Sequence, residues 1–242
     1  MKLIVLGKYG PFPKQHSATS SYLLETDGKF FLLDAGSGSF SRLCAILPPE
    51  KLNGIIISHS HYDHTADLGV YHYYFENLSK RGVPFIKPRV YLFDDGSPSL
   101  RPAVESPYFD VVNISDGAVF THEGTELAFT RLYHPATDFG VKFRSENKVF
   151  CYTGDTNLCD PLENFVTSAD VFLADGGFLS RDWSEKKPHL SVEIICKLSE
   201  KLGNRAIITH FSPLYDEAEI IEEKARSGGN CLLAEEGETY CI

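Results

Sequence analysis

The stretch that most constrains this chain is Ile57-Ser58-His59-Ser60-His61-Tyr62-Asp63-His64, where four side chains that can bind metal fall within six positions. It continues the apolar run Gly54-Ile55-Ile56-Ile57, whose β-branched residues are typical of a buried strand. A strand that ends in such residues places them at the carboxyl edge of a sheet, where α/β proteins usually keep their sites. The sequence therefore predicts a metal site at this edge.

The spacing within this motif suits one shared cavity. His59 and His61 alternate with Ser60, so in extended backbone their side chains leave the strand on the same side. Asp63 and His64 come after the turn and can face the same cavity from the start of the next helix. Imidazole and carboxylate ligands suit zinc or another borderline first-row ion. The alternative, a polar turn with solvated histidines, is disfavoured because this spacing is far more specific than a lone histidine.

Length and net charge limit the size of the fold and the kinds of partner that this chain can have. The 242 residues are enough for one large α/β domain with a full hydrophobic core. The formal net charge of −10 disfavours nonspecific binding to a long nucleic acid, which needs clustered lysine and arginine. Two bound divalent ions would add positive charge locally, so a small phosphate-bearing substrate is compatible with this charge.

The cysteines and the amino terminus favour a cytoplasmic protein. None of the six cysteines forms a C-x-x-C pair, and a chain of this length needs no disulfide framework, so reduced thiols are the simpler interpretation. Residues 1–7 indicate a short strand and lack the long apolar region of a signal peptide. No apolar run is long enough to span a bilayer, so no membrane partner is expected.

The first part of the chain predicts a hairpin followed by helices. Residues 20–26 and 29–33 indicate two strands joined by an Asp-Gly turn. The second strand ends in Asp34, which can either orient a ligand histidine or cap a helix predicted at 40–47. After the histidine motif, apolar residues at helical spacing predict a helix from about 65 to 78.

The middle of the chain is less regular. Residues 84–107 hold five prolines and one strand-like run, and they are either a connector or a lid. Residues 111–114, 118–121 and 126–133 then indicate antiparallel strands. The last of them ends at His134, a further candidate ligand because it is a histidine at a strand end.

The second half again delivers polar residues at strand ends. A hairpin around Glu146-Asn147 ends in Thr153-Gly154-Asp155, and a short buried strand ends at Asp175. His189 stands at the start of a helix that Gly203 terminates.

The two halves of the chain show a weak internal similarity. Residues 54–59 and 206–210 are both apolar strands that end in a hydroxyl residue and a histidine, the second being His210. A last helix at 216–226 and a terminal hairpin follow. Two similar halves facing one another predict an α/β (α+β) four-layer sandwich, with two sheets inside and helices outside, as a single domain over residues 1–242.

These residues resemble the metallo-β-lactamase superfamily. The H-x-H-x-D-H motif, the later histidine, the Gly-Asp-Thr turn and the strand ending in His210-Phe211-Ser212 match its motifs over nearly the whole chain. The resemblance implies an αββα metallo-β-lactamase-like sandwich with two divalent metal ions, zinc first, with manganese or iron as alternatives. By resemblance the ligands are His59, His61 and His134 for one ion and Asp63, His64 and His210 for the other, with Asp155 bridging them.

Within the superfamily the chain is similar to the ribonuclease Z-like phosphodiesterases, on His189-Leu190-Ser191 and the run from His210 to Tyr215. It departs from true ribonuclease Z because a hairpin uses most of the short stretch between His134 and Asp155, which leaves no room for the tRNA-binding arm. It also offers Asp175 where that enzyme has a glutamate partner for its non-ligand histidine. The expected substrate is therefore a small phosphodiester, cyclic nucleotide, cyclic phosphate or short oligonucleotide.

The resemblance also implies a mechanism. A hydroxide bridging the two ions would attack phosphorus, since paired ions lower the pKa of bound water toward neutrality. His189 would stabilise the transition state or protonate the leaving oxygen, and Asp63 could also orient the hydroxide. Asp34 and Asp175 would support these groups from behind.

Two other functions stay open at this point. One is a metal-dependent lactonase or thioesterase on the same scaffold, in which His189 would matter less. The other is a non-catalytic metal-binding module. A homodimer is common among such relatives, and the sequence carries no clear trace of the oligomeric state.

Overall fold

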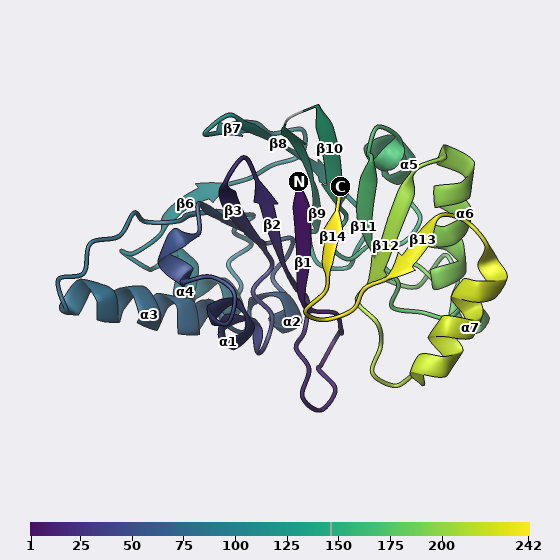
Figure 1. Ribbon diagram of the computed structural model, residues 1–242, viewed down its shortest axis with the longest axis horizontal. Helices are drawn as coiled ribbons and strands as arrows, with labels where there is room; N and C mark the ends of the chain where they lie inside the picture. The colour runs from purple at the N-terminus through teal and green to yellow at the C-terminus, as the bar shows by residue number, and fades with distance from the viewer. Residues whose placement is uncertain (146) are drawn as a thin grey trace.

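Two seven-stranded sheets lie face to face, with helices on the outer side of each, in the computed structural model of this chain (Figure 1). The structure describes residues 1–145 and 147–242. Glu146 of the predicted hairpin turn therefore lies outside the described residues, whereas both strands of that hairpin are present. The order helix, sheet, sheet, helix is the four-layer sandwich that the sequence predicts.

The first sheet combines an antiparallel half with a parallel half. Its strands, in spatial order, are β14 (Thr239–Cys241), β1 (Lys2–Gly7), β2 (Ser21–Thr26), β3 (Lys29–Leu33), β4 (Gly54–Ile56), β5 (Arg89–Leu92) and β6 (Asp110–Asn113). From β3 to β6 the strands are parallel, and parallel strands need crossover connections. The crossovers hold α1 (Ser39–Cys44), η1 (Pro49–Lys51), α2 (Tyr62–Thr65), α3 (Leu68–Lys80), η2 (Pro98–Leu100) and α4 (Arg101–Val104).

The second sheet has the same general plan. Its strands, in spatial order, are β13 (Cys231–Leu233), β12 (Arg205–Thr209), β11 (Val171–Asp175), β10 (Lys148–Tyr152), β9 (Phe139–Ser145), β8 (Thr125–Arg131) and β7 (Val119–His122). The parallel strands β10 to β13 are connected through α5 (Asp160–Thr167), η3 (Ser180–Asp182), α6 (Val192–Leu202) and α7 (Glu217–Ser227). In Figure 1, α1 to α4 lie on the side of the first sheet and α5 to α7 on the side of the second.

The main hydrophobic core lies between the two sheets. The ring centroids of Tyr22 and Tyr152 are 5.3 Å apart, and those of Phe31 and Phe143 are 5.4 Å apart, so aromatic pairs join one sheet to the other. Along β3 the side chains alternate: Phe31 belongs to this core, whereas Leu32 packs into a second cluster under α1 and α3. Because both faces are covered, the strands are apolar on both sides.

The predicted helix from 65 to 78 is wrong in its extent, because the structure divides this region into α2 and α3. The break falls at Asp67, whose Oδ2 accepts from the backbone N–H of Phe40 at 2.9 Å. The helix predicted at 40–47 is also shorter in the structure, where α1 ends at Cys44.

Two strand pairings predicted from the sequence are also wrong. β6 is not antiparallel to β7; it pairs in parallel with β5 at the edge of the first sheet, and the chain then crosses to the second sheet. The terminal strands form no hairpin, because β13 pairs with β12 and β14 pairs with β1 in the other sheet. Short strands carry no local signal of which sheet they join.

The proline-rich segment 84–107 is a connection that carries β5, η2 and α4. It also braces the histidine motif: Ser60 Oγ donates to Asp95 Oδ2 at 2.7 Å, and the Ser99 hydroxyl donates to the Ser60 carbonyl oxygen at 2.5 Å. Every helix in residues 1–145 and 147–242 is too short or too polar to cross a membrane.

Candidate metal centre

The fold brings the seven predicted metal-binding side chains to one edge of the sandwich. Loops or helix starts that follow β4, β8, β10 and β12 supply them, and in both sheets these are the carboxyl ends of strands. The ligand atoms of His59, His61 and His134 lie within 4.8 Å of one another, and so do those of Asp63, His64, Asp155 and His210. The structure thus groups these side chains into the two sets that the resemblance implies.

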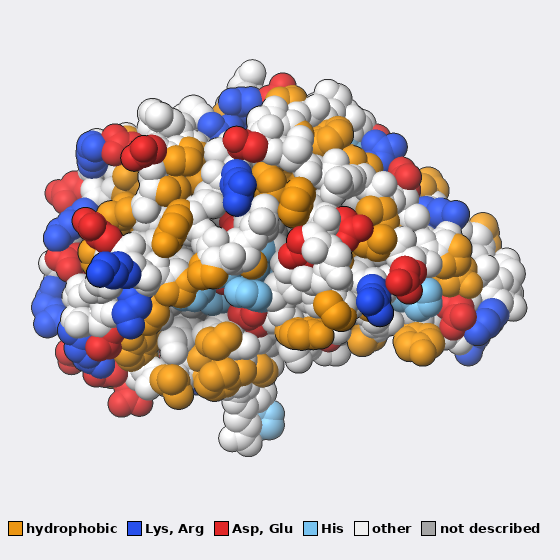
Figure 2. Space-filling model, turned by 180° about the vertical axis from the view of Figure 1, so that it is seen from behind, with side chains coloured by type: hydrophobic (Ala, Val, Ile, Leu, Met, Phe, Trp, Pro, Cys, Tyr) orange, Lys and Arg blue, Asp and Glu red, His pale blue; other side chains and the backbone are white. Residues whose placement is uncertain are grey.

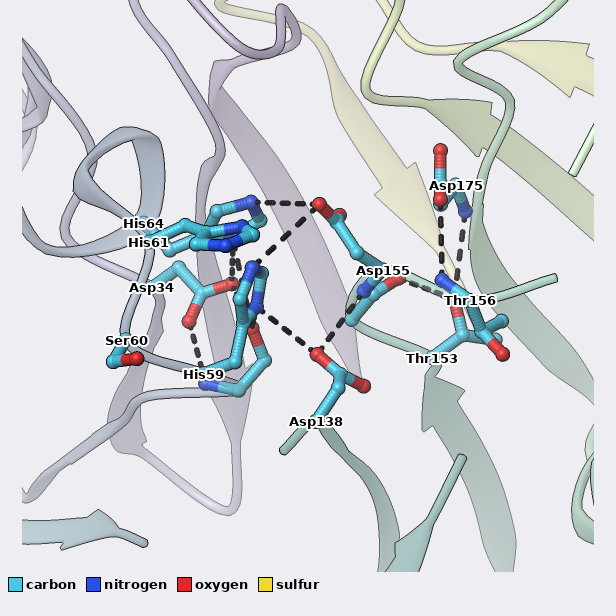
Figure 3. Close-up of polar contacts among 12 residues, drawn as sticks. Asp34, His59, Ser60, His61, His64, Asp138, Thr153, Asp155, Thr156 and Asp175 are labelled. Carbon is cyan, nitrogen blue, oxygen red and sulfur yellow. Dashed lines mark hydrogen bonds and ion pairs between the residues drawn. The ribbon is translucent and has the colours of Figure 1, made fainter. Parts of the chain in front are cut away.

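Asp155 reaches histidines of both sets, and Figure 3 shows its carboxylate facing His59 and His64. Its Oδ2 is 3.2 Å from His210 Nε2, 3.3 Å from His64 Nε2 and 3.7 Å from His59 Nε2. Asp63 Oδ2 faces the same side, 3.1 Å from His210 Nε2. One carboxylate that reaches histidines of both sets is suited to bridge two cations.

The residues fit divalent cations because several inward-facing ligand atoms make no hydrogen bond and face mainly one another. Within the described part of the chain, His59 Nε2, His64 Nε2 and Asp155 Oδ1 are buried and make no hydrogen bond. Such orphaned polar atoms are costly in a protein interior. Imidazole nitrogen and carboxylate oxygen are the donors that zinc and related ions prefer, so cations among these atoms would satisfy them.

Asp34 holds His64 from behind. Its Oδ2 lies 2.7 Å from His64 Nδ1 and also accepts from the Ser58 hydroxyl at 2.8 Å and from Tyr152 at 2.5 Å. Its φ of 57° costs of order 1 kcal/mol for a non-glycine residue and persists where the surroundings hold it. Of the two roles the sequence leaves open, the structure shows contact with a histidine, whereas Gly38 precedes α1.

Asp138 supports His59 in the same way, and sequence reasoning missed it. Its Oδ1 lies 3.0 Å from His59 Nδ1 and accepts from the backbone N–H of Asp155 at 3.2 Å (Figure 3). Burial, with the carboxylates of Asp155 and Asp34, raises the pKa of Asp138 well above its usual value. The only sequence signal was an acidic residue four positions after His134, which does not distinguish it from other loop aspartates.

Asp175 pairs with His189, the histidine that the resemblance leaves outside the two ligand sets, although the ligand atoms of Asp155, Asp175, His189 and His210 also lie within 4.8 Å of one another. His189 Nδ1 lies 2.7 Å from Asp175 Oδ2, and the other carboxylate oxygen of Asp175 lies 3.3 Å from His210 Nδ1. The His189 ring centroid is 4.9 Å from that of His210 and 5.6 Å from that of His134. These distances place the imidazole beside both candidate metal sets. Its side chain is 18% exposed, so it is also accessible from outside.

Protonation separates the histidines of the two sets. Burial lowers the pKa of His59 well below its usual value and that of His134 to about 4, so both are neutral and ready to bind metal at neutral pH. Burial would also lower the pKa of His64 and His210, but the Asp155 carboxylate and its neighbours raise both well above the usual value. A cation would replace the protons that these carboxylates now attract.

The site opens on the face shown in Figure 2, where histidine side chains lie in a hollow with hydrophobic side chains around it. Residues adjacent to the ligands in sequence are exposed, including Tyr62 at 67% and Tyr133 at 49%. Lys187 Nζ lies 5.1 Å from the centroid of the Phe178 ring, and that ring is 5.7 Å from the His189 ring. The Phe178 ring therefore has the Lys187 ammonium and the accessible histidine as neighbours.

Comparison with known proteins agrees with this geometry. A family profile described as "Beta-lactamase superfamily domain" matches residues 29–211, well over half of the chain. The chain therefore belongs to the β-lactamase superfamily, and its fold and site define a metallo-hydrolase of that class. This membership implies the binding of divalent metal.

Individual relatives are distant but match over more than nine tenths of their length. The probable metallo-hydrolase YhfI of Bacillus subtilis is 23% identical over 239 residues, covering 98% of each chain, and its crystal structure superposes with a TM-score of 0.91 over 99% of this chain and 98% of that one. A ribonuclease Z of Streptomyces avermitilis is 24% identical, covering 94% of this chain and 92% of that protein. A diphosphatase of the PhnP family is 17% identical with a TM-score of 0.74, covering 100% of this chain and 97% of that one.

Proposed function

We propose that this chain is a dinuclear metal-dependent phosphodiesterase that acts on a small phosphodiester, a cyclic nucleotide or a cyclic phosphate. The observation that carries the proposal is the His189–Asp175 pair beside the two candidate ligand sets, 2.7 Å between Nδ1 and Oδ2. The ions would be zinc, with manganese or iron as alternatives. The proposed ligands are His59, His61 and His134 for one ion, Asp63, His64 and His210 for the other, and Asp155 for both.

Bound as a pair, such ions supply Lewis acidity for the phosphoryl oxygens and lower the pKa of bound water toward neutrality. The chain supplies the remaining groups. Asp63 Oδ2 faces inward, 3.1 Å from His210 Nε2. There it can orient the attacking water as well as bind a metal ion. Asp34 and Asp138 fix the orientation of His64 and His59 through their Nδ1 atoms.

His189 is the proposed acid for the leaving oxygen. Its Nδ1 is committed to Asp175, so Nε2 is the atom that can donate a proton to substrate. Burial would lower the pKa of His189, but the carboxylates of Asp175 and Asp155 raise it above the usual value. The protonated form therefore persists toward neutral pH and is lost as the pH rises through this raised pKa.

Charge and relatives support an anionic, small substrate. Lys187 lies beside the Phe178 ring, which adjoins His189. Its positive charge would attract a phosphate, whereas a neutral lactone offers it no opposite charge. β9 and β10 occupy most of the stretch between His134 and Asp155, which leaves no separate arm for a large RNA. The names of two relatives, a ribonuclease Z and a diphosphatase, point to phosphorus chemistry.

The deciding experiment is a substrate panel on purified protein whose metal content has been measured. Bis(p-nitrophenyl) phosphate and 2′,3′-cyclic nucleotides are compared with simple lactones and thioesters. We expect turnover of the phosphodiesters. Turnover of lactones or thioesters alone would favour the alternative hydrolases, and metal-loaded protein that is inert on every ester would indicate a non-catalytic module.

Replacing His189 by alanine tests the acid. We expect His189→Ala to retain its metal and to lose ~10²–10⁴ in kcat on substrates with a poor leaving group, the usual contribution of a general acid. We expect wild-type activity to fall at high pH as His189 loses its proton, and this fall should disappear with the imidazole. A variant with full metal content and full turnover would remove His189 from the mechanism.

A further inference from the structure

Asn157 is a fully buried amide whose hydrogen-bonding capacity is completely used. Its Nδ2 donates to the carbonyl oxygens of Lys187 and Ser184, at 2.6 and 2.9 Å. Its Oδ1 accepts from the backbone N–H of Leu158 at 2.7 Å and from Trp183 Nε1 at 2.9 Å. A side-chain amide offers two donor hydrogens and two acceptor lone pairs, so all four positions are occupied.

These bonds join three segments that carry residues of the candidate site. Asn157 follows Asp155 by two positions. Its backbone N–H donates at 3.1 Å to the carbonyl oxygen of Tyr133, directly before His134. The loop that accepts its two side-chain donors runs on into His189. Asn157 therefore ties together three loops: its side-chain amide holds the loop of the proposed acid, and its backbone N–H holds the loop of a proposed ligand to that of the proposed bridging carboxylate.

The loop before His189 has few other anchors. Residues 184–187 are exposed, and the backbone bond from Lys187 N–H to the Ser184 carbonyl, at 3.0 Å, lies within the loop itself. Among the described residues, the His189 side chain makes its one hydrogen bond to Asp175. That bond fixes Nδ1, whereas the path of the loop decides where the rest of the ring points.

We propose that Asn157 is a positioning residue that holds the loop 183–188 so that His189 keeps its place between Asp175 and the substrate. This inference rests on the proposed function, because Asn157 acts through His189 and does not touch the reacting atoms. Without the amide the loop can move, and a displacement of about 1 Å can cost ~10²-fold in rate.

The test is a double-mutant cycle of Asn157→Ala and His189→Ala in zinc-loaded protein, on whichever ester of the panel the wild type hydrolyses. We expect Asn157→Ala to lower kcat ~10²-fold with little change in KM. In the His189→Ala background the same change should cost about threefold or less, because residues that act through one group are not additive. An equal loss in both backgrounds would overturn the proposal.

Fluorescence gives a readout that does not depend on catalysis. Trp183 is the only tryptophan of the chain, and its indole N–H bonds Asn157 Oδ1. Asn157→Ala should move its emission to longer wavelength, with or without metal, as the loop opens to water. The matched control is Asn204→Ala, which removes another buried amide, one that donates to the Val166 carbonyl at 2.9 Å beside β12, and should leave both emission and kcat unchanged.

The remaining outcomes are separable. If Asn157→Ala does not fold, Asn157→Ser replaces it: its hydroxyl is neutral and too short to reach both loop carbonyls, so kcat should fall and the emission should move as expected of the alanine variant. An unchanged emission in Asn157→Ala shows that the amide does not hold the loop and overturns the inference. A wild type that is inert on every ester defeats the proposed function, while the emission comparison still decides whether Asn157 holds the loop.

Discussion

Three buried carboxylates stand behind three of the histidines at the candidate site. Asp34 holds His64, Asp138 holds His59 and Asp175 holds His189, each through the Nδ1 atom at 2.7–3.0 Å. A carboxylate at Nδ1 selects the tautomer and the orientation of the ring, and so decides where Nε2 points. The precision of the site therefore depends on residues that would not themselves touch metal or substrate.

Asp138 provides the clearest test at this scale. Asp138→Asn keeps the shape of the side chain but puts an amide, which cannot ionise, where the carboxyl group faces His59 Nδ1, so we expect zinc affinity to fall ~10–100-fold. Competition with a chromophoric chelator measures it. Asp116→Asn, at an exposed carboxylate that accepts from the Arg131 N–H, is the control and should bind zinc as the wild type does. Unchanged affinity in Asp138→Asn would mean that His59 needs no such support.

At the scale of elements, the loop after β1 closes the site from the opposite sheet. Gly10 N–H donates to the Phe211 carbonyl at 3.2 Å, and the Phe211 N–H donates back to the Lys8 carbonyl at 2.9 Å. These two backbone hydrogen bonds hold the loop against Phe211, the residue after His210. A β-carbon on Gly10 would lie 1.9 Å from His210 Nε2, so only glycine lets the backbone pass here.

This close approach predicts the effect of one methyl group. Gly10→Ala should push the His210 ring out of its set and lower the bound metal from about two ions per chain toward one. Elemental analysis after gel filtration measures the ratio. Gly69→Ala is the matched control, because a β-carbon there meets no atom within 4 Å and alanine favours the helix by about 1 kcal/mol. Full metal content in Gly10→Ala would show that the loop backbone moves aside and that the His210 ring stays in place.

At the scale of the whole molecule, the candidate centre joins the two halves of the sandwich. The motif from His59 to His64 follows β4 of the first sheet, whereas His134, Asp155 and His210 follow strands of the second. Cations bound between them would cross-link the sheets at one edge, next to the aromatic contacts of the core. Metal binding should therefore contribute to stability as well as to chemistry.

Removing the metal should destabilise the fold. A ligand present at a thousand times its Kd contributes about 4 kcal/mol, which for a chain of this size shifts Tm on the order of 10 °C. We expect chelation to lower Tm by this order in calorimetry and added zinc to restore it. The gain should shrink as the pH falls, because protons on His64 and His210, whose pKa values are raised without metal, compete with the ions. A Tm indifferent to chelator would argue against cations between the sheets.

Local pattern predicts much of the fold, and the family resemblance that its motifs carry predicts the candidate residues. Apolar runs that end in His59, Asp155 or His210 predict both a buried strand and the edge at which its last side chain emerges. The pairing of β6, β13 and β14 could not be predicted, because these strands are three or four residues long and their partners lie far away in the chain. Which sheet they join depends on where the rest of the chain leaves an open edge.

The sequence by itself predicts the layered class of the fold from its strand patterns, and it predicts the seven side chains that converge through the family resemblance that its motifs carry. Only the tertiary structure decided which carboxylate stands behind which histidine, and that Asn157 joins three loops. Asp138 and Asn157 lie in loops without periodicity, and their roles arise from neighbours that folding brings to within 3 Å or so of them. Contacts of this kind are not written in local sequence, since they exist only once distant segments meet.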